Sequence, residues 1–263
     1  MNPLLEQIME TTKEEIKGIK RSIRGKNRPE DLPEIRDFTT AVSRPGQIHL
    51  IAEIKYASPS TGVLSEKRDS LKISTAYETA GAAAVSLVTE KHFFNGDIRE
   101  ISLLKQRMRL PVLRKDFIMD PVQLEESFLY GADAVLFIAR ILSPAQLREL
   151  ICAANAFGLH VLVEIHDETD LEKALACGAK LIGINNRDLN TFQVDPGVTA
   201  RLAPRIPSAC VRVSESGFRS AQDIQRFISQ DIQAVLVGTA LMKSTDIFAA
   251  ARSFVEAGQE LPW

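Results

Sequence analysis

The sequence predicts an α/β protein in which strands and helices alternate along the chain, and two series of apolar runs carry that prediction. The first series ends each run in a charged residue and recurs about every fifty residues: HLIAEIK (49–55), LPVLRK (110–115), HVLVE (160–164) and CVRVSE (210–215). A second series with a similar period lies between them: AGAAAVSLV (80–88), YGADAVLFIA (130–139), CGAKLIGIN (177–185) and the diverged QAVLVGTAL (233–241). Two interleaved series of four predict eight buried strands.

The segments between these runs have the start, periodicity and stop signals of helices. Residues 143–158 begin with a Ser-Pro pair and end at a glycine, residues 168–178 place apolar side chains at helical spacing, and residues 220–229 do the same. Strands that alternate with helices favour a parallel sheet with helical crossovers. Eight such units in 263 residues fit a single closed (β/α)8 TIM barrel, which typically needs about 250 residues. The absence of a GxGxxG motif after the first strand argues against an open dinucleotide-binding sheet.

Residues 1–47 precede the first strand and predict a helical extension, so that residues 48–263 form the barrel. The segment PLLEQIMETTKEEIKGIKRSI has apolar residues at roughly helical intervals after Asn2-Pro3. A second short helix is expected after the proline-containing segment at residues 29–33. The apolar stripe of the first helix must cover a surface, and docking on the barrel is our interpretation, with a dimer contact as the alternative.

Composition limits the partners of the protein. A formal charge of −2 and a pI near 6.1 give no electrostatic case for nucleic acid or an anionic membrane. Three cysteines without a CxxC pair indicate a reducing compartment, and the four scattered histidines predict no metal site. The start of the chain lacks signal-peptide features, and no run approaches the roughly twenty apolar residues of a membrane span. We expect a cytoplasmic protein, a monomer or weak homodimer, that binds a small molecule.

The charged ends of the first series predict a catalytic rim. Lys55, Lys115, Glu164 and Glu215 end the first, third, fifth and seventh strands. In a barrel, alternate strands contribute to one layer and catalytic groups lie at the carboxyl ends of strands, so two ammoniums should face two carboxylates. Two further groups belong to this rim: Glu53, which points the same way as Lys55 two residues later, and Asn185, which ends the sixth strand.

Phosphate recognition has an expected location in the loops after the seventh and eighth strands. There SESGF (214–218) and VGTAL (237–241) place Ser216, Gly217, Gly238 and Thr239, where barrels often build an anion site from backbone N–H groups. Each glycine alone could be an ordinary turn, and it is their occurrence at both strands that favours the site. The loop SPSTG (58–62) offers the hydroxyls of Ser58 and Ser60, although an ordinary turn or helix cap would use the same residues.

These residues together resemble a known family. The motifs AEIKYASPSTG, LRKDFI, LVEI, IGINNRDL, SESGF and VGTALM, in this order and spacing, are similar to those of indole-3-glycerol phosphate synthases, over essentially the whole chain. Tyr56 and Thr61 depart from the pattern, since a basic residue is frequent at both positions. The resemblance implies a TIM-barrel carboxy-lyase of tryptophan biosynthesis that uses no cofactor. Its substrate would be 1-(o-carboxyphenylamino)-1-deoxyribulose 5-phosphate, which is closed to a ring, decarboxylated and dehydrated.

The resemblance also implies a role for each rim residue. Lys115 is the general acid for ring closure and Glu164 the base in dehydration, whereas Lys55 binds substrate anions, including the phosphate, and is a candidate source of the second proton. Glu53 orients the two lysines, and Glu215 and Asn185 hold sugar hydroxyls. A neighbouring ammonium lowers the pKa of a lysine while nearby carboxylates raise it, and the sequence leaves this balance open.

The resemblance further implies an apolar slot for the aromatic ring, formed by Phe94, Phe117, Leu136 and Leu189. It also implies Asn95 as a further substrate-binding residue and Arg187 as a candidate partner of the anthranilate carboxylate. Phe117 and Leu136 could instead be plain core. Arg187 could instead pair with Asp188 or Glu164. Arg212 lies within the seventh strand on the side that should pack against helices, and the sequence gives no reason for a charge there.

Two other functions compete with this interpretation. A Schiff-base aldolase or sugar-phosphate isomerase on the same barrel would use Lys115 as a nucleophile. A non-enzymatic sensor of a phosphorylated ligand would not require two lysines and three glutamates in one opening.

Overall fold

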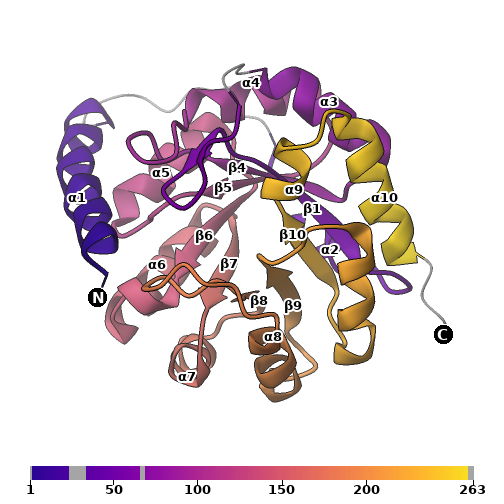
Figure 1. Ribbon diagram of the computed structural model, residues 1–263. Helices are drawn as coiled ribbons and strands as arrows, with labels where there is room; N and C mark the ends of the chain where they lie inside the picture. Colours follow the sequence, from indigo (N-terminus) through magenta and orange to yellow (C-terminus); the bar gives the residue numbers. More distant parts are fainter. Residues whose placement is uncertain (1, 24–33, 66–68, 260–263) are drawn as a thin grey trace.

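The protein folds into a closed eight-stranded parallel barrel surrounded by helices (Figure 1). This computed structural model describes residues 2–23, 34–65 and 69–259. Each barrel strand pairs with its two neighbours in the order β1-β10-β9-β8-β7-β6-β5-β4. The strands are β1 (His49–Ile54), β4 (Ala84–Val88), β5 (Val112–Lys115), β6 (Ala134–Ile138), β7 (His160–Ile165), β8 (Leu181–Asn185), β9 (Val211–Glu215) and β10 (Ala234–Val237). All eight predicted strands are confirmed. Apolar runs that are buried on both faces are typical of parallel strands.

Helices follow the strands and cover the outside of the barrel. They are α3 (Ser70–Ala80), α4 (Arg99–Arg107), α5 (Pro121–Tyr130), α6 (Pro144–Ala156), α7 (Glu168–Ala176), α8 (Gly197–Leu202), α9 (Thr239–Met242) and α10 (Ile247–Gln259), with 3₁₀ segments η1 (Ala139–Ile141), η2 (Ala203–Arg205) and η3 (Ala221–Gln230). A small hairpin of β2 (Ala57–Ser58) and β3 (Gly62–Val63) follows β1. None of the helices that the structure describes is both long and apolar enough to cross a bilayer.

The helix signals in the sequence are confirmed by the caps. Ser143 accepts a hydrogen bond from the Gln146 N–H, and the Gln146 side chain accepts one from the Ser143 N–H, so a capping box starts α6. Helix α7 ends at Ala176, and Gly178 follows with a φ of 87°, which favours glycine. The third predicted helix, η3, is a 3₁₀ helix. Its rise of about 2.0 Å per residue lets few residues span the crossover between β9 and β10.

The N-terminal helix lies against an outer helix of the barrel. Helix α1 (Pro3–Ile23) packs against α5 (Figure 1) and buries Leu5, Ile8 and Ile16. Its exposed side reaches loops at the carboxyl ends of the strands, where Lys20 pairs with Asp120 at 2.6 Å and Glu15 approaches His92 at 2.9 Å. Helix α2 (Phe38–Ala41) follows, as expected, whereas the proline-containing segment at 29–33 lies outside the described residues.

Two sets of buried charges away from the cavity have local charged partners. Arg212 pairs with Asp231 and donates to the Ile206 carbonyl at 2.7 Å, so it joins β9 to the ends of η2 and η3. These contacts explain a charge that the sequence pattern leaves unexplained. At the amino ends of the strands, Lys105 and Asp133 form a fully buried ion pair, and Asp133 also accepts from the backbone N–H groups of Arg36 and Val112.

Candidate active site

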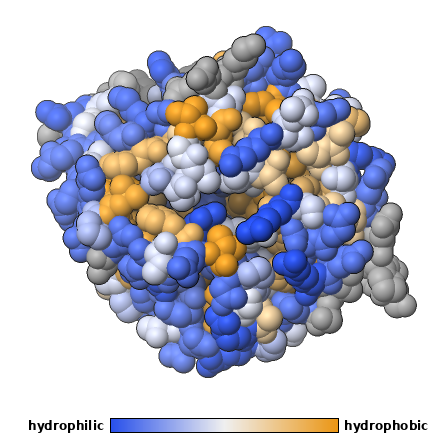
Figure 2. All heavy atoms as spheres, in the orientation of Figure 1, coloured by the Kyte–Doolittle hydropathy of each residue, from blue (hydrophilic) through white to orange (hydrophobic). Residues whose placement is uncertain are grey.

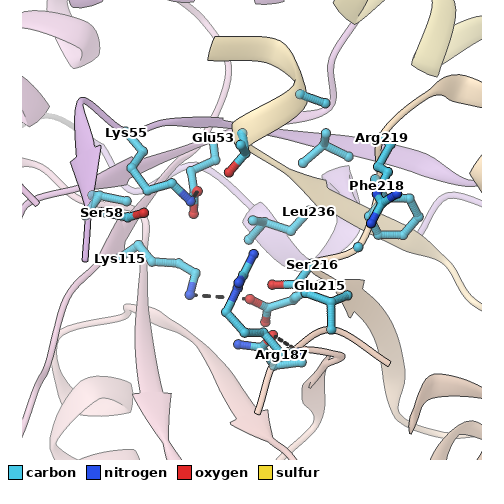
Figure 3. A pocket seen from close by; sticks show the side chains of 18 of the residues that line it. Glu53, Lys55, Ser58, Lys115, Arg187, Glu215, Ser216, Phe218, Arg219 and Leu236 are labelled. Carbon is cyan, nitrogen blue, oxygen red and sulfur yellow. Dashed lines mark hydrogen bonds and ion pairs between the residues drawn. The ribbon is translucent and has the colours of Figure 1, made fainter. Parts of the chain in front are cut away.

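A cavity of about 1290 Å³ opens at the carboxyl ends of the barrel strands. Figure 2 shows this hollow near the centre of the face, bordered by both hydrophobic and hydrophilic side chains. The six predicted rim residues Glu53, Lys55, Lys115, Glu164, Asn185 and Glu215 all line it. Their positions follow from strand geometry, because they lie at the carboxyl ends of five barrel strands, with Glu53 and Lys55 both at the end of β1. Glu53, Lys55, Lys115 and Glu215 point into the cavity in Figure 3.

Lys115 is the centre of the charged cluster. Its Nζ donates to Glu164 Oε2 at 2.9 Å and lies 3.4 Å from Glu215 Oε2. Only 17 % of the Lys115 side chain and 2 % of each glutamate side chain are exposed, so the charges interact with little screening by water. The cluster therefore joins one ammonium on β5 to carboxylates on β7 and β9.

The sequence leaves open whether the pKa of Lys115 is raised or lowered, and the nearby carboxylates decide this. Burial alone would lower the pKa of Lys115, but Glu164, Glu215 and Glu53 reverse the effect and raise it. Burial likewise would raise the pKa of Glu164, yet Lys115 and His166 hold it below its ordinary value. Glu215 differs, because burial raises its pKa and the Glu164 and Glu53 charges add to this against the opposing Lys115. Lys115 is thus a protonated acid, Glu164 an ionised carboxylate and Glu215 the carboxyl that retains a proton more readily of the two.

Lys55 and Glu53 form a second ion pair at the opening. Lys55 Nζ donates to Glu53 Oε1 at 2.6 Å, so Glu53 orients Lys55 directly. Glu53 influences Lys115 only through its charge, since none of the described contacts joins the two side chains. The prediction that Glu53 orients both lysines by hydrogen bonds therefore holds in the structure for Lys55 alone.

Two glycines leave the space that these carboxylates occupy. A Cβ on Gly183, in the middle of β8, would lie 2.0 Å from Glu215 Oε1. A Cβ on Gly238, directly after β10, would lie 2.2 Å from Glu53 Oε1. Both distances are far inside van der Waals contact, so both positions exclude side chains. Sequence reasoning missed this use of Gly183 and gave Gly238 a role in phosphate binding alone.

Arg187 and Asn185 occupy the loop that follows β8. Asn185 Oδ1 accepts from the Arg187 N–H at 3.0 Å, and the Arg187 guanidinium donates to the Phe192 carbonyl at 2.9 Å. Among the residues that the structure describes, no carboxylate lies within ion-pair distance of Arg187, so the two alternative partners, Asp188 and Glu164, do not hold it. Its guanidinium points into the cavity in Figure 3 and is available to an anion.

Apolar side chains line another part of the cavity. Phe94 and Phe117 face each other with ring centroids 6.2 Å apart, and Leu136 and Leu189 also line the cavity. Phe117 and Leu136 thus border the cavity while they also pack on the core. Asn95 is exposed and is not among the described residues that line the cavity; it turns the chain with a φ of 55°. Because of this turn, the side chain of Phe94 faces the cavity and that of Asn95 does not.

Sequence reasoning missed Glu90, which holds the loop of Phe94. The buried Glu90 carboxylate accepts from the backbone N–H groups of His92, Phe93 and Phe94 at 2.7 to 3.0 Å. Its signal was present, because the apolar run of β4 also ends in a charge two residues beyond the strand. Glu90 lines the cavity as well, but its oxygens are engaged by the loop.

The predicted anion site forms a third part of the cavity. Ser216, Gly217, Gly238 and Thr239 line it, and α9 begins there, where first-turn N–H groups have no partner inside the helix. Ser216 and Gly217 have φ values of 66° and 91°, so the chain turns sharply after β9. Arg219 and Lys243 also border this region and were not singled out from the sequence.

The SPSTG loop and the two departures from the family pattern have simple structural explanations. Ser58 and Ser60 line the cavity, although Ser58 also closes the β2–β3 turn through the Thr61 hydroxyl at 2.5 Å. Tyr56 is buried and donates to Glu100 at 2.7 Å. Neither Tyr56 nor Thr61 is among the described residues that line the cavity, so neither supplies or removes charge inside it.

Comparison of the fold with solved structures gives barrels of the same type. The chain superposes on 3-hexulose-6-phosphate synthase from Salmonella typhimurium with a TM-score of 0.61 and 15 % identity, covering 80 % of this chain and 98 % of that one. Its superposition on thiamine phosphate pyrophosphorylase from Pyrococcus furiosus has a TM-score of 0.62 and 12 % identity, and covers 81 % of this chain and 96 % of that one. At such low identity these matches establish the TIM-barrel fold alone.

Comparison of the sequence identifies the family. The family model of indole-3-glycerol phosphate synthase matches residues 5–254. The chain is 43 % identical over 259 residues to the indole-3-glycerol phosphate synthase of Desulforamulus reducens, covering 97 % of this chain and 98 % of the relative. It is 46 % identical over 228 residues to the indole-3-glycerol phosphate synthase of Dehalococcoides mccartyi, covering 86 % of this chain and 88 % of the relative. The chain therefore belongs to the indole-3-glycerol phosphate synthase family.

Proposed function

We propose that the barrel opening converts 1-(o-carboxyphenylamino)-1-deoxyribulose 5-phosphate to indole-3-glycerol phosphate, carbon dioxide and water. The observation that carries this proposal is the Lys115 ammonium between two buried carboxylates in the cavity. A protonated acid and an ionised base in contact are the groups that ring closure and dehydration require. The work of the enzyme is then proton transfer and positioning, which these residues can supply by themselves.

The three parts of the cavity match the three parts of this substrate. The phosphate would bind the loops after β9 and β10, with Lys55 as a neighbouring cation. The anthranilate ring would lie against Phe94 and Phe117, and its carboxylate would pair with Arg187, which has no carboxylate partner in the described cavity. This placement brings the ribulose carbonyl and hydroxyls to the charged cluster, with Asn185 and Glu215 as their hydrogen-bond partners.

Lys115 acts as the general acid in the first step. The ring carbon that bears the carboxylate attacks the ribulose carbonyl, and Lys115 protonates the oxygen as the new carbon–carbon bond forms. Because its neighbours raise the pKa of Lys115, the proton is present at neutral pH. The same raised pKa works against a Schiff-base mechanism, which needs a neutral amine. Loss of carbon dioxide leaves its bonding electron pair with the ring system.

Dehydration completes the reaction. The hydroxyl on the former carbonyl carbon departs as water with a proton from an acid, for which Lys55 and the recharged Lys115 are candidates. Glu164 removes the remaining proton and the indole becomes aromatic. Glu164 is ionised and in place because Lys115 and His166 lower its pKa. We also infer a cytoplasmic location, which the three free cysteines support.

The test is to incubate the protein with this substrate and to follow the fluorescence of the indole product. We expect turnover by the wild type, none by Lys115→Ala, and wild-type rates from Lys180→Ala, a matched change of an exposed lysine. Well-folded wild type without product would contradict the function, and near-normal turnover by Lys115→Ala would contradict the acid. A borohydride-trapped mass adduct on Lys115 would favour the Schiff-base aldolase or isomerase instead.

A further inference from the structure

A buried histidine behind the catalytic cluster has no part in the mechanism so far. His166 follows β7 directly, and only 2 % of its side chain is exposed. Its Nε2 lies 3.3 Å from Glu164 Oε1 and its Nδ1 lies 3.5 Å from Asp170 Oδ2. The imidazole therefore lies between the proposed base and a second carboxylate on α7.

Each ring nitrogen lies within ion-pair distance of a carboxylate oxygen, although neither forms a hydrogen bond, and this proximity favours the charged ring. A neutral imidazole would turn a lone pair towards one of the two anions, whereas an imidazolium presents N–H on both sides. Burial alone would lower the pKa of His166, but Asp170 and Glu164 reverse this and raise it to about 9. The ring is consequently cationic at neutral pH.

The charges around His166 alternate outward from the cavity. Asp170 lies 3.3 Å from Arg140 Nε and 3.8 Å from Lys173 Nζ, and Arg140 also pairs with Asp167 at 2.5 Å. The groups that face the imidazolium are thus Glu164 on β7 and Asp170 on α7, with Arg140 of η1 and Lys173 of α7 behind Asp170. These cations hold Asp170 in place, and Asp170 holds His166.

The two oxygens of Glu164 are shared between two different cations. Oε2 accepts from Lys115 at 2.9 Å, and Oε1 lies next to His166. We propose that His166 is a positioning residue that holds Oε1 of Glu164 and so keeps Oε2 directed at Lys115 and the substrate. This proposal rests on the proposed function, because it assigns His166 a part in the work of Glu164 as base.

The contribution of His166 is largest after the first step. Once Lys115 has given its proton to the carbonyl oxygen, it no longer balances the Glu164 charge, and the neighbouring cation that remains at that carboxylate is His166. Without His166, the negative charge of Glu164 would be buried and uncompensated, so Glu164 would tend to take up a proton before dehydration. His166 therefore keeps Glu164 ionised between the step in which Lys115 acts as an acid and the step in which Glu164 acts as a base.

The experiment is a pH profile of kcat and KM for four variants. His166→Leu removes both the charge and the N–H, His166→Gln keeps a donor without the charge, and Asp170→Asn weakens the support of His166. His160→Leu is the matched control, because His160 begins β7 at the end of the barrel opposite His166, where its ring contacts Thr39 and Asp37. Melting temperature and circular dichroism report folding separately.

We expect His166→Leu to lower kcat at neutral pH by about 10- to 100-fold, which is a part of the ~10²- to 10⁴-fold that a general base contributes. KM should change little, and the acidic limb of kcat should move upward by about one pH unit, since loss of a nearby cation raises the pKa of Glu164. His166→Gln should recover part of kcat but keep part of the shift, and Asp170→Asn should shift the limb in the same direction.

A merely structural histidine would give a different result. His166→Leu and Asp170→Asn would then lower the melting temperature but leave the acidic limb of the folded enzyme unchanged, and that outcome overturns the positioning role. If His166→Leu does not fold, the unshifted profile of Asp170→Asn or His166→Gln would be equally decisive. An inactive, well-folded wild type would instead refute the proposed function, so the two failures can be told apart.

Discussion

Gly183→Ala should damage catalysis far more than it damages folding. The added Cβ would lie 2.0 Å from Glu215 Oε1 and 3.3 Å from a Leu162 methyl group. Gly183 is in the middle of β8 and pairs with Glu164 on one side and Val213 on the other, so the backbone cannot move away. The Glu215 carboxylate must therefore shift by about 1.4 Å to reach an ordinary contact of 3.4 Å.

This displacement sets the expected size of the effect. Glu215 Oε2 is only 3.4 Å from Lys115, and a misplacement of about 1 Å at a reacting centre can cost about 100-fold in rate. We expect kcat to fall about 100-fold. Overpacking costs about 1–3 kcal/mol, offset by about 0.4–1 kcal/mol from the stiffer unfolded chain, so the free energy of unfolding should fall by no more than about 2.5 kcal/mol.

Steady-state kinetics by indole fluorescence and urea unfolding measure the two quantities on the same preparation. Gly18→Ala is the control, because Gly18 lies in α1 with no atom within 4 Å of the added Cβ. It should leave kcat unchanged and stabilise the protein by about 0.5–1 kcal/mol. Wild-type kcat in Gly183→Ala would refute the reasoning, since it would mean that the Glu215 carboxylate does not need the space above this glycine.

Two changes should affect stability in ways that the contacts define. The pKa of His166 is raised from 6.5 to about 9, so its contribution to the free energy of unfolding is fully present below pH 6.5 and is lost as the pH rises through 9. In urea unfolding over that pH range, the wild type should lose up to ~3 kcal/mol more stability than His166→Gln. Parallel pH dependence of the two proteins would contradict this. Asp133→Asn should cost about 3–5 kcal/mol because it leaves the buried Lys105 ammonium unpaired, with kcat of the folded fraction unchanged. Lys105→Met should cost less, since two backbone N–H groups still bond Asp133, and an equal loss would argue against the asymmetry.

The sequence was sufficient to predict the eight strands and the inward direction of the charged strand ends. Strand periodicity places Glu53 and Lys55 on one side, and parallel strands bring Lys115, Glu164 and Glu215 to one end of the barrel. The alternation of strand and helix fixes this geometry without knowledge of any contact. The capping box of α6 was similarly local, since Ser143 and Gln146 are three residues apart.

Features that depend on distances between different strands could not be predicted. The sign of the pKa shift of Lys115 required the positions of three carboxylates on three strands, and one neighbouring lysine suggested the opposite direction. The space above Gly183 depends on how far the Glu215 side chain leans towards β8. Asn95 was assigned to the cavity with Phe94, although a left-handed turn directs only one of two adjacent side chains inward.

The bound substrate would change the protonation of the cluster in a direction that suits the second half of the reaction. Its phosphate and carboxylate bring negative charge to a site in which burial and the Glu164 and Glu53 charges already raise the pKa of Glu215. Arg187 and Lys55 offset part of that charge, but Glu215 lies only 3.4 Å from Lys115, which becomes neutral after ring closure. The pKa of Glu215 must then rise further, so this residue would meet the sugar hydroxyls as a protonated donor. A neutral Glu215 would then be a further candidate acid for dehydration, with Glu164 as the base. The imidazolium of His166 next to Glu164 would account for the different protonation of these two glutamates.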